Sequence, residues 1–180
     1  MKKLVVYQSK TGFAKQYAQW LAEVLEAEII ELKAAAKINF SDYDWVVFGG
    51  GVYASKINGL KKFKGLMASF KQDRVVVFAV GAVPKSLENT RRLMETNLGD
   101  WGVVPGFFYL EGGFDLQRLN PGMKLILRGM QKALRRKAEK NPQSLTEEEK
   151  SFLEGFSEKA SRLDPGNIQE IVSYIGEGRR

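Results

Sequence analysis

Short apolar runs alternate along the chain with segments in which apolar residues recur every three or four positions. The runs cover residues 4–7, 28–32, 45–48, 74–80 and 103–110, and their content of Val, Ile, Phe and Leu predicts five strands. Helical spacing predicts helices over residues 14–25, 60–70 and 86–97, and a last one after Asp164-Pro165. Strands that alternate with helices in this way predict an α/β fold whose parallel sheet is covered on both faces.

The segment between the fifth strand and the last helix is longer than a minimal domain of this class needs. It spans about residues 115–163 and is expected to form two helices. Their boundaries are marked by Asn120-Pro121, by Asn141-Pro142 and by a capping box of Thr146 and Glu149. A length of 180 residues predicts one domain, residues 1–180, that carries this helical insertion.

Two residue types are absent from the chain, cysteine and histidine. Their absence excludes disulfides, thiolate nucleophiles and thiolate metal sites, and it removes the commonest general base and metal ligand. We therefore expect no metal site and no catalytic side chain, although hydrolysis by paired carboxylates stays open. Redox chemistry would have to be carried by a bound organic cofactor.

The hydrophobic segments are too short for a secretory signal or a membrane span. The first apolar run covers only residues 4–7, and the longest apolar stretch, residues 45–54, is interrupted by three glycines. The expected location is the cytoplasm, either free or peripheral at the inner face of the cytoplasmic membrane.

The loop after the first strand has the composition of a phosphate site. It comprises Ser9, Lys10, Thr11, Gly12, Phe13 and Ala14 and leads directly into a helix. The start of a helix directs backbone N–H groups and the positive end of the helix dipole at an anion, and hydroxyl groups add further donors. The same residues also fit an ordinary capped helix start.

Glycine-rich loops follow three further strands. The candidate ligand-binding residues in them are Gly51, Val52, Tyr53 and Ala54, then Gly81, Ala82 and Val83, and finally Gly112 and Gly113. In an open parallel sheet these loops converge with the phosphate loop at the carboxyl edge. Tyr53 would offer a flat apolar surface to a ring, with Phe13 or Phe114 as substitutes. Each loop alone is better explained as an ordinary turn, but the three loops together with the phosphate loop favour a ligand site.

Residues 4–13 and 43–53 resemble the flavodoxin family in both the phosphate loop and the first ring-binding loop. This resemblance implies a doubly wound five-stranded sheet of order 2-1-3-4-5 and one FMN bound without a covalent link. The family usually reads Ser/Thr-x-Thr-Gly-x-Thr, and this chain lacks the last hydroxyl because Ala14 occupies its position. Lys10 is expected to compensate by its charge. No Gly-x-Gly-x-x-Gly follows the first strand, so a dinucleotide site has no support.

The resemblance is closer to one branch of that family, which contains the bacterial menaquinone-dependent protoporphyrinogen dehydrogenases. The similar parts are residues 108–114 and the basic run 121–130, because that branch also carries a basic helical insertion after the fifth strand. It implies an FMN-dependent oxidoreductase with a porphyrin substrate and a quinone or redox-protein partner. The alternatives are an electron carrier without its own substrate and a binding module that has lost its flavin. Carriers of this family are typically acidic, whereas this chain has a pI near 9.5 and carries the insertion, which favours the enzyme or a membrane-associated partner.

The net charge of +7 is concentrated in one window. Residues 118–140 contain eight basic residues and one acid, so the rest of the chain is neutral. Helix 121–136 combines these cations with an apolar stripe of Met123, Ile126, Leu127, Met130 and Leu134. Such a helix can lie in a membrane interface, attract an acidic substrate or partner, or simply pack on the domain. No aromatic residue interrupts the window, so nucleic acid is not an expected partner.

Overall fold

A computed structural model describes residues 1–67, 70, 72–102, 105–113, 121–146, 149–150, 152–153 and 161–178. Two residues named above, Phe114 and Asn120, lie outside these ranges, as does most of the segment expected to form the second insertion helix.

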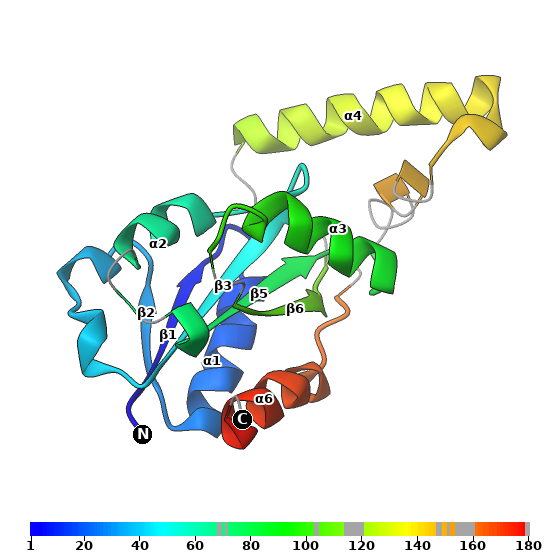
Figure 1. Ribbon diagram of the computed structural model, residues 1–180. Coiled ribbons are helices and arrows are strands. Elements are labelled where there is room, and N and C mark those ends of the chain that lie inside the picture. The colour runs from blue at the N-terminus through cyan, green and yellow to red at the C-terminus, as the bar shows by residue number, and fades with distance from the viewer. Residues whose placement is uncertain are drawn as a thin grey trace.

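The centre of the fold is a parallel sheet of order β2-β1-β3-β5-β6, which confirms the predicted topology (Figure 1). Its strands are β1 (Lys3–Gln8), β2 (Glu28–Glu31), β3 (Trp45–Tyr53), β5 (Val75–Gly81) and β6 (Gly106–Glu111). A two-residue strand, β4 (Lys56–Ile57), turns back antiparallel on the end of β3 and was not predicted.

β3 is longer than the predicted run of residues 45–48 because its glycines continue the sheet. Gly49 and Gly50 pair with β1 on one side and β5 on the other. A Cβ on Gly49 would fall inside the ring of Phe78, so the glycine makes room for an aromatic ring of the neighbouring strand. The predicted fifth strand corresponds to β6, which begins at Gly106 and ends at Glu111, while residues 103–104 of the predicted run lie outside the described residues.

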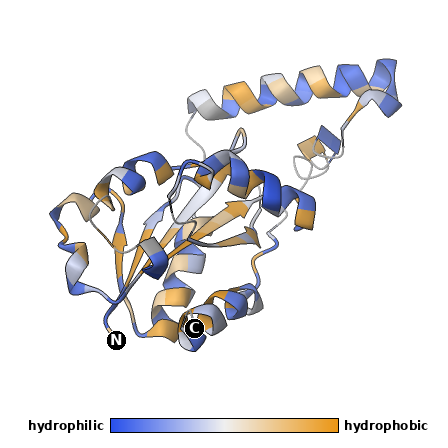
Figure 2. Cartoon of the chain, in the orientation of Figure 1, coloured by the Kyte–Doolittle hydropathy of each residue, from blue (hydrophilic) through white to orange (hydrophobic). Residues whose placement is uncertain are grey.

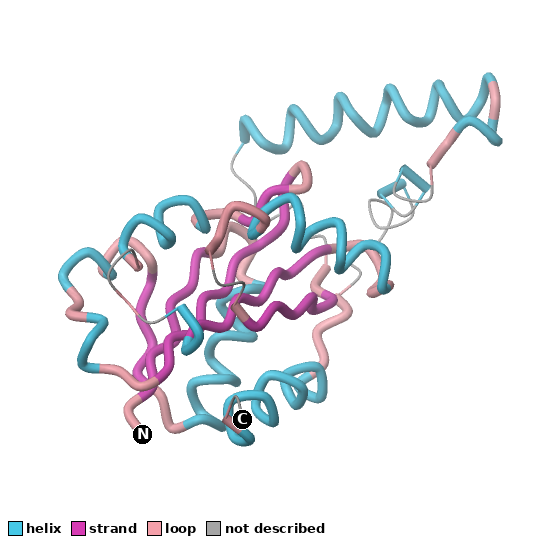
Figure 3. The backbone as a smooth tube through the Cα atoms, viewed as in Figure 1, coloured by secondary structure: helices cyan, strands magenta, loops and turns pink. Residues whose placement is uncertain are grey.

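Helices cover the two faces of the sheet and bury two apolar cores (Figure 3). On one face pack α1 (Phe13–Leu25) and α6 (Gln169–Glu177), with Tyr17, Leu21 and Ile171 fully buried. On the other face pack α2 (Leu60–Leu66) and α3 (Leu87–Leu98). Short 3-10 turns complete the connections at Ala35–Lys37, Phe40–Asp42, Gln72–Arg74, Pro142–Ser144 and Pro165–Ile168.

The helix termini follow local signals in the sequence. Ser86 caps α3, since its Oγ accepts a hydrogen bond from the N–H of Asn89 at 3.1 Å. α2 ends at Leu66, earlier than the predicted residue 70, and its capping residue is Met67.

The first insertion helix, α4 (Pro121–Lys140), runs four residues beyond the predicted end and stands clear of the sheet (Figure 1). The predicted capping box is present: Glu149 accepts from the N–H of Thr146 at 2.9 Å, and Thr146 Oγ1 accepts from the N–H of Glu149 at 3.2 Å. Glu149 also pairs with Lys137 of α4 at 2.7 Å. Hydrophobic and hydrophilic residues alternate along α4 (Figure 2), and no helix in the described ranges is long and apolar enough to cross a membrane.

Candidate functional site

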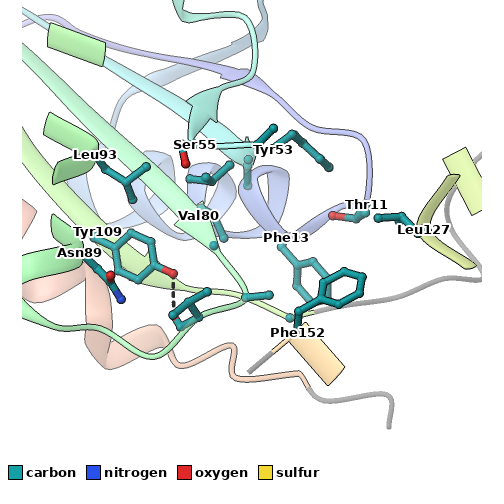
Figure 4. Close-up of a pocket in the computed structure, with 18 of the residues that line it drawn as sticks. Thr11, Phe13, Tyr53, Ser55, Val80, Asn89, Leu93, Tyr109, Leu127 and Phe152 are labelled. Carbon is teal, nitrogen blue, oxygen red and sulfur yellow. Dashed lines mark hydrogen bonds between the residues drawn. The ribbon is translucent and has the colours of Figure 1, made fainter. Parts of the chain in front are cut away.

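A cavity of about 570 Å³ opens at the carboxyl edge of the sheet (Figure 4). This volume lies within the usual range for a small-molecule site. Most of the residues singled out in the sequence line it: Ser9, Thr11, Phe13, Ala14, Gly51, Val52, Tyr53, Ala54, Gly81, Ala82, Val83 and Gly113. The others, Lys10, Gly12 and Gly112, are not among the residues that line it.

One end of the cavity is the start of α1. Gly12 takes the N-cap position with φ 91°, a left-handed conformation that glycine adopts without steric cost. Its N–H donates to Ser9 Oγ at 3.0 Å, which holds the loop in a tight turn while the Ser9 hydroxyl keeps its own proton to donate. No side chain caps the helix. The amides of the first turn of α1 therefore have no intrahelical acceptor and carry the positive end of the dipole.

Tyr53 joins this phosphate loop to the end of β3. The ammonium group of Lys10 lies over its ring, 4.9 Å from the centroid, and its hydroxyl hydrogen-bonds with Thr11. Burial raises the pKa of Tyr53, and the bond with Thr11 opposes that shift. The phenol is thus protonated at neutral pH.

The loop after β5 is held by Tyr109, a residue that the sequence analysis did not single out. Tyr109 is 2% exposed, and its hydroxyl donates to the carbonyl of Val83 at 2.5 Å. Burial raises the pKa of Tyr109 far above its usual value. Nothing in the sequence separates this tyrosine from the other aromatic residues of the fifth strand, because its partner lies 26 positions away.

Further residues of the cavity come from α3 and from the insertion. Asn89, Arg92 and Leu93 of α3 line one side. The apolar stripe of α4 lines the outer side with Ile126, Leu127, Met130 and Leu134, and Glu149 and Phe152 follow it. Figure 4 draws Leu127 and Phe152 among the side chains that line the cavity, together with Thr11 and Phe13. The pairing with Lys137 holds the pKa of Glu149 below its usual range, so this acid is ionised and its charge is matched.

These features fit FMN in particular. An uncapped helix start with two hydroxyl groups suits a phosphate monoester, and a wide apolar space bordered by an aromatic ring suits a flat ring system. Glycines let side chains of the cavity wall pack closely against the backbone: a Cβ on Gly51 would come within 3.1 Å of Tyr53, and one on Gly112 within 2.5 Å of Val80. The described residues include no cluster of acids that could hold a metal ion.

A comparison of the sequence with protein-family models indicates the same fold as the sheet topology. The model of the flavodoxin domain matches residues 4–141, which include the five parallel strands, apart from the first residue of β1, and all of α4. The chain belongs to the flavodoxin family. The flavodoxin fold thus accounts for the sheet order and for the convergence of the loops at one edge.

Solved flavodoxins and flavoproteins are similar to this chain at low identity and low TM-score. An archaeal flavodoxin is 19% identical over 62% of this chain and 85% of its own, with a TM-score of 0.42. Flavodoxin 2 of Bacillus cereus is 16% identical over 66% and 90%, with a TM-score of 0.45. A flavoprotein from Lactobacillus acidophilus, solved in complex with FMN, is 15% identical over 61% and 91%, with a TM-score of 0.44. A search of curated proteins gives no match.

Proposed function

We propose that this flavodoxin-family chain is an FMN-dependent oxidoreductase that binds the cofactor without a covalent link in the cavity described above. The observation that carries the proposal is the uncapped start of α1, which opens with Ser9 and Thr11 on a cavity bordered by three glycine-rich strand ends.

The residues have distinct parts in this proposal. The first-turn amides of α1 and the hydroxyls of Ser9 and Thr11 would donate to the phosphate, and Lys10 would add positive charge in place of the hydroxyl missing at Ala14. Tyr53 would cover the ring, and the backbone of residues 81–83 would meet its polar edge. When bound, FMN supplies the redox chemistry, while the protein binds, orients and shields it from water.

The chemistry of the substrate is suggested by the wall that α4 provides. A carrier of electrons has no need for an apolar helix over its cofactor, whereas an enzyme needs a space that an organic substrate can enter. Ile126, Leu127, Met130 and Leu134 line the cavity and favour an apolar substrate. The cations of α4 do not line it, but their charge on the same helix would attract an anionic substrate. A porphyrinogen as reductant and a quinone as oxidant fit this description, as the resemblance to the protoporphyrinogen dehydrogenase branch implies.

A role as electron carrier is the second candidate. Ile126 is 60% and Met130 48% exposed, so the outer wall of the cavity is accessible to a redox protein. The same exposure supports peripheral contact of α4 with an anionic membrane, since Leu125 is 74% exposed among the basic residues.

Flavin titration tests the proposal directly. The purified protein is expected to quench FMN fluorescence with a stoichiometry of one, and the reduced holoprotein is expected to be reoxidised by menaquinone. Reduction of the holoprotein by protoporphyrinogen would support the enzyme. A protein that is reoxidised only by another redox protein would be a carrier, and one that takes up no FMN would refute the proposal.

A further inference from the structure

The turn between β3 and β4 holds two residues in an unfavourable backbone conformation. Tyr53 pairs with Lys56, so the hairpin loop consists of Ala54 and Ser55 alone. Their φ angles are 46° and 60°. Two-residue hairpins with both φ values positive strongly favour Asn-Gly, because residues with a side chain pay a steric cost there. This chain has neither residue at these positions.

The side chain of Asn97, on α3, bonds to this turn on both sides. Its Oδ1 accepts from the N–H of Ile57 at 3.0 Å, and its Nδ2 donates to the carbonyl of Ser55 at 2.9 Å. Nδ2 also donates to the carbonyl of Leu93, at 2.9 Å, one turn earlier in α3. Because an N–H can only donate and a carbonyl can only accept, these partners fix the orientation of the amide. The bonds span about 40 residues of sequence and tie the hairpin to the helix.

The turn held in this way forms part of the cavity. Tyr53, Ala54 and Ser55 all line it, whereas Asn97 does not. Asn97 is half-buried behind the turn, so any effect that it has on a ligand passes through the hairpin. Tyr53 is the first residue before the strained pair, and a change of the turn would therefore alter the direction of its ring.

We propose that Asn97 is a positioning residue of the flavin site. It holds residues 54–55 in the left-handed conformation before the cofactor arrives, and so places Tyr53 and the turn backbone in advance of the ring. A preorganised site binds its ligand more tightly, because the conformational entropy of the turn is not lost on binding. The inference rests on the proposed function, and it concerns the ring end of the site rather than the phosphate end.

The proposal predicts that the need for Asn97 depends on the residue at position 55. Glycine adopts positive φ without steric cost, so a turn with Ser55→Gly keeps its conformation with less help. We expect Asn97→Ala to weaken binding of FMN and of riboflavin by the same factor, about 5- to 20-fold, which corresponds to the loss of one or two hydrogen bonds. In the Ser55→Gly background this factor is expected to fall below about 3-fold.

The experiment measures flavin affinity by fluorescence quenching in four proteins: wild type, each single variant and the double variant. Arg91→Ala is the matched control, because Arg91 lies on α3 with its side chain 73% exposed and away from the cavity. The midpoint potential of bound FMN is the second readout, and it is expected to shift in Asn97→Ala but not in Arg91→Ala. Should Asn97→Ala not fold, Asn97→Asp keeps the acceptor for Ile57 and removes the donor to Ser55.

The outcomes separate this inference from the proposed function. A wild type that binds neither flavin overturns both. A wild type that binds flavin while Asn97→Ala binds it equally well, with the same potential, overturns the role of Asn97 alone. An equal loss in the Ser55 and Ser55→Gly backgrounds has the same consequence, because it would separate Asn97 from the strain of the turn.

Discussion

Replacement of Gly81 by alanine tests how tightly the loop after β5 is fixed. Gly81 is buried at the end of β5, and an added Cβ would meet the hydroxyl of Tyr109 and lie 2.8 Å from its Cε2. The ring cannot move away freely, because its hydroxyl is bonded to the carbonyl of Val83 at 2.5 Å. The substitution therefore forces either a strained core or the loss of that hydrogen bond.

The expected cost follows from these two effects. Overpacking of a buried site costs about 1–3 kcal/mol, and the lost hydrogen bond adds about 1 kcal/mol. For a chain of this length each kcal/mol lowers Tm by about 2–4 °C, so Gly81→Ala should lower Tm by roughly 5–15 °C. FMN affinity should fall as well, since residues 81–83 line the cavity.

Urea and thermal unfolding of the protein without flavin measure the loss of stability caused by Gly81→Ala, both in wild type and in the Tyr109→Phe background. Tyr109→Phe removes the hydroxyl, which is the atom nearest to the added Cβ, and with it the hydrogen bond that restrains the ring. In the Tyr109→Phe background, Gly81→Ala should therefore lower the free energy of unfolding by about 1 kcal/mol less than in wild type. Gly65→Ala is the control: an added Cβ at this helical position meets nothing within 4 Å, and about 0.5–1 kcal/mol of stabilisation is expected. An equal cost of Gly81→Ala in both backgrounds would refute the reasoning.

Three further predictions concern the ligand and the insertion. Thr11→Asp places a carboxylate beside the phosphate and should weaken FMN by roughly 1–3 kcal/mol but riboflavin far less; equal losses in a titration would place the phosphate elsewhere. Tyr53→Ala should cost roughly 1 kcal/mol of flavin affinity and shift the potential, and unchanged values of both would assign the stacking to another aromatic residue. Wild type should co-sediment with anionic but not neutral vesicles, since each cation near an anionic leaflet contributes about 1 kcal/mol. Binding to anionic vesicles should be lost when glutamate replaces Lys124, Arg128 and Lys132 together. Equal sedimentation of wild type and this variant would exclude a membrane role for α4.

Several features of the fold could be predicted because they depend on local order in the chain. The apolar runs and helical stripes identify the five parallel strands and their helices, and Ser86, Thr146 and Glu149 act within three or four residues of their partners. The convergence of the glycine-rich strand ends at one edge could also be predicted, because all strands of a parallel sheet end at the same edge. The roles of the residues at that edge stay predictions until a flavin is titrated.

The sequence by itself thus determined the class of fold, the family and the edge of the sheet at which a ligand would lie. Only the tertiary structure decided which way the α4 stripe faces, and it places Ile126, Leu127, Met130 and Leu134 along the cavity. It also revealed the short hairpin strand β4. Tyr109 and Asn97 emerged only there as well, because their partners lie tens of residues away. The periodicity of apolar residues indicates which side of a helix or strand is apolar, but it does not indicate which other segment that side packs against. Contacts between segments that are distant in sequence form only when the whole chain packs, so they cannot be predicted from a local sequence pattern.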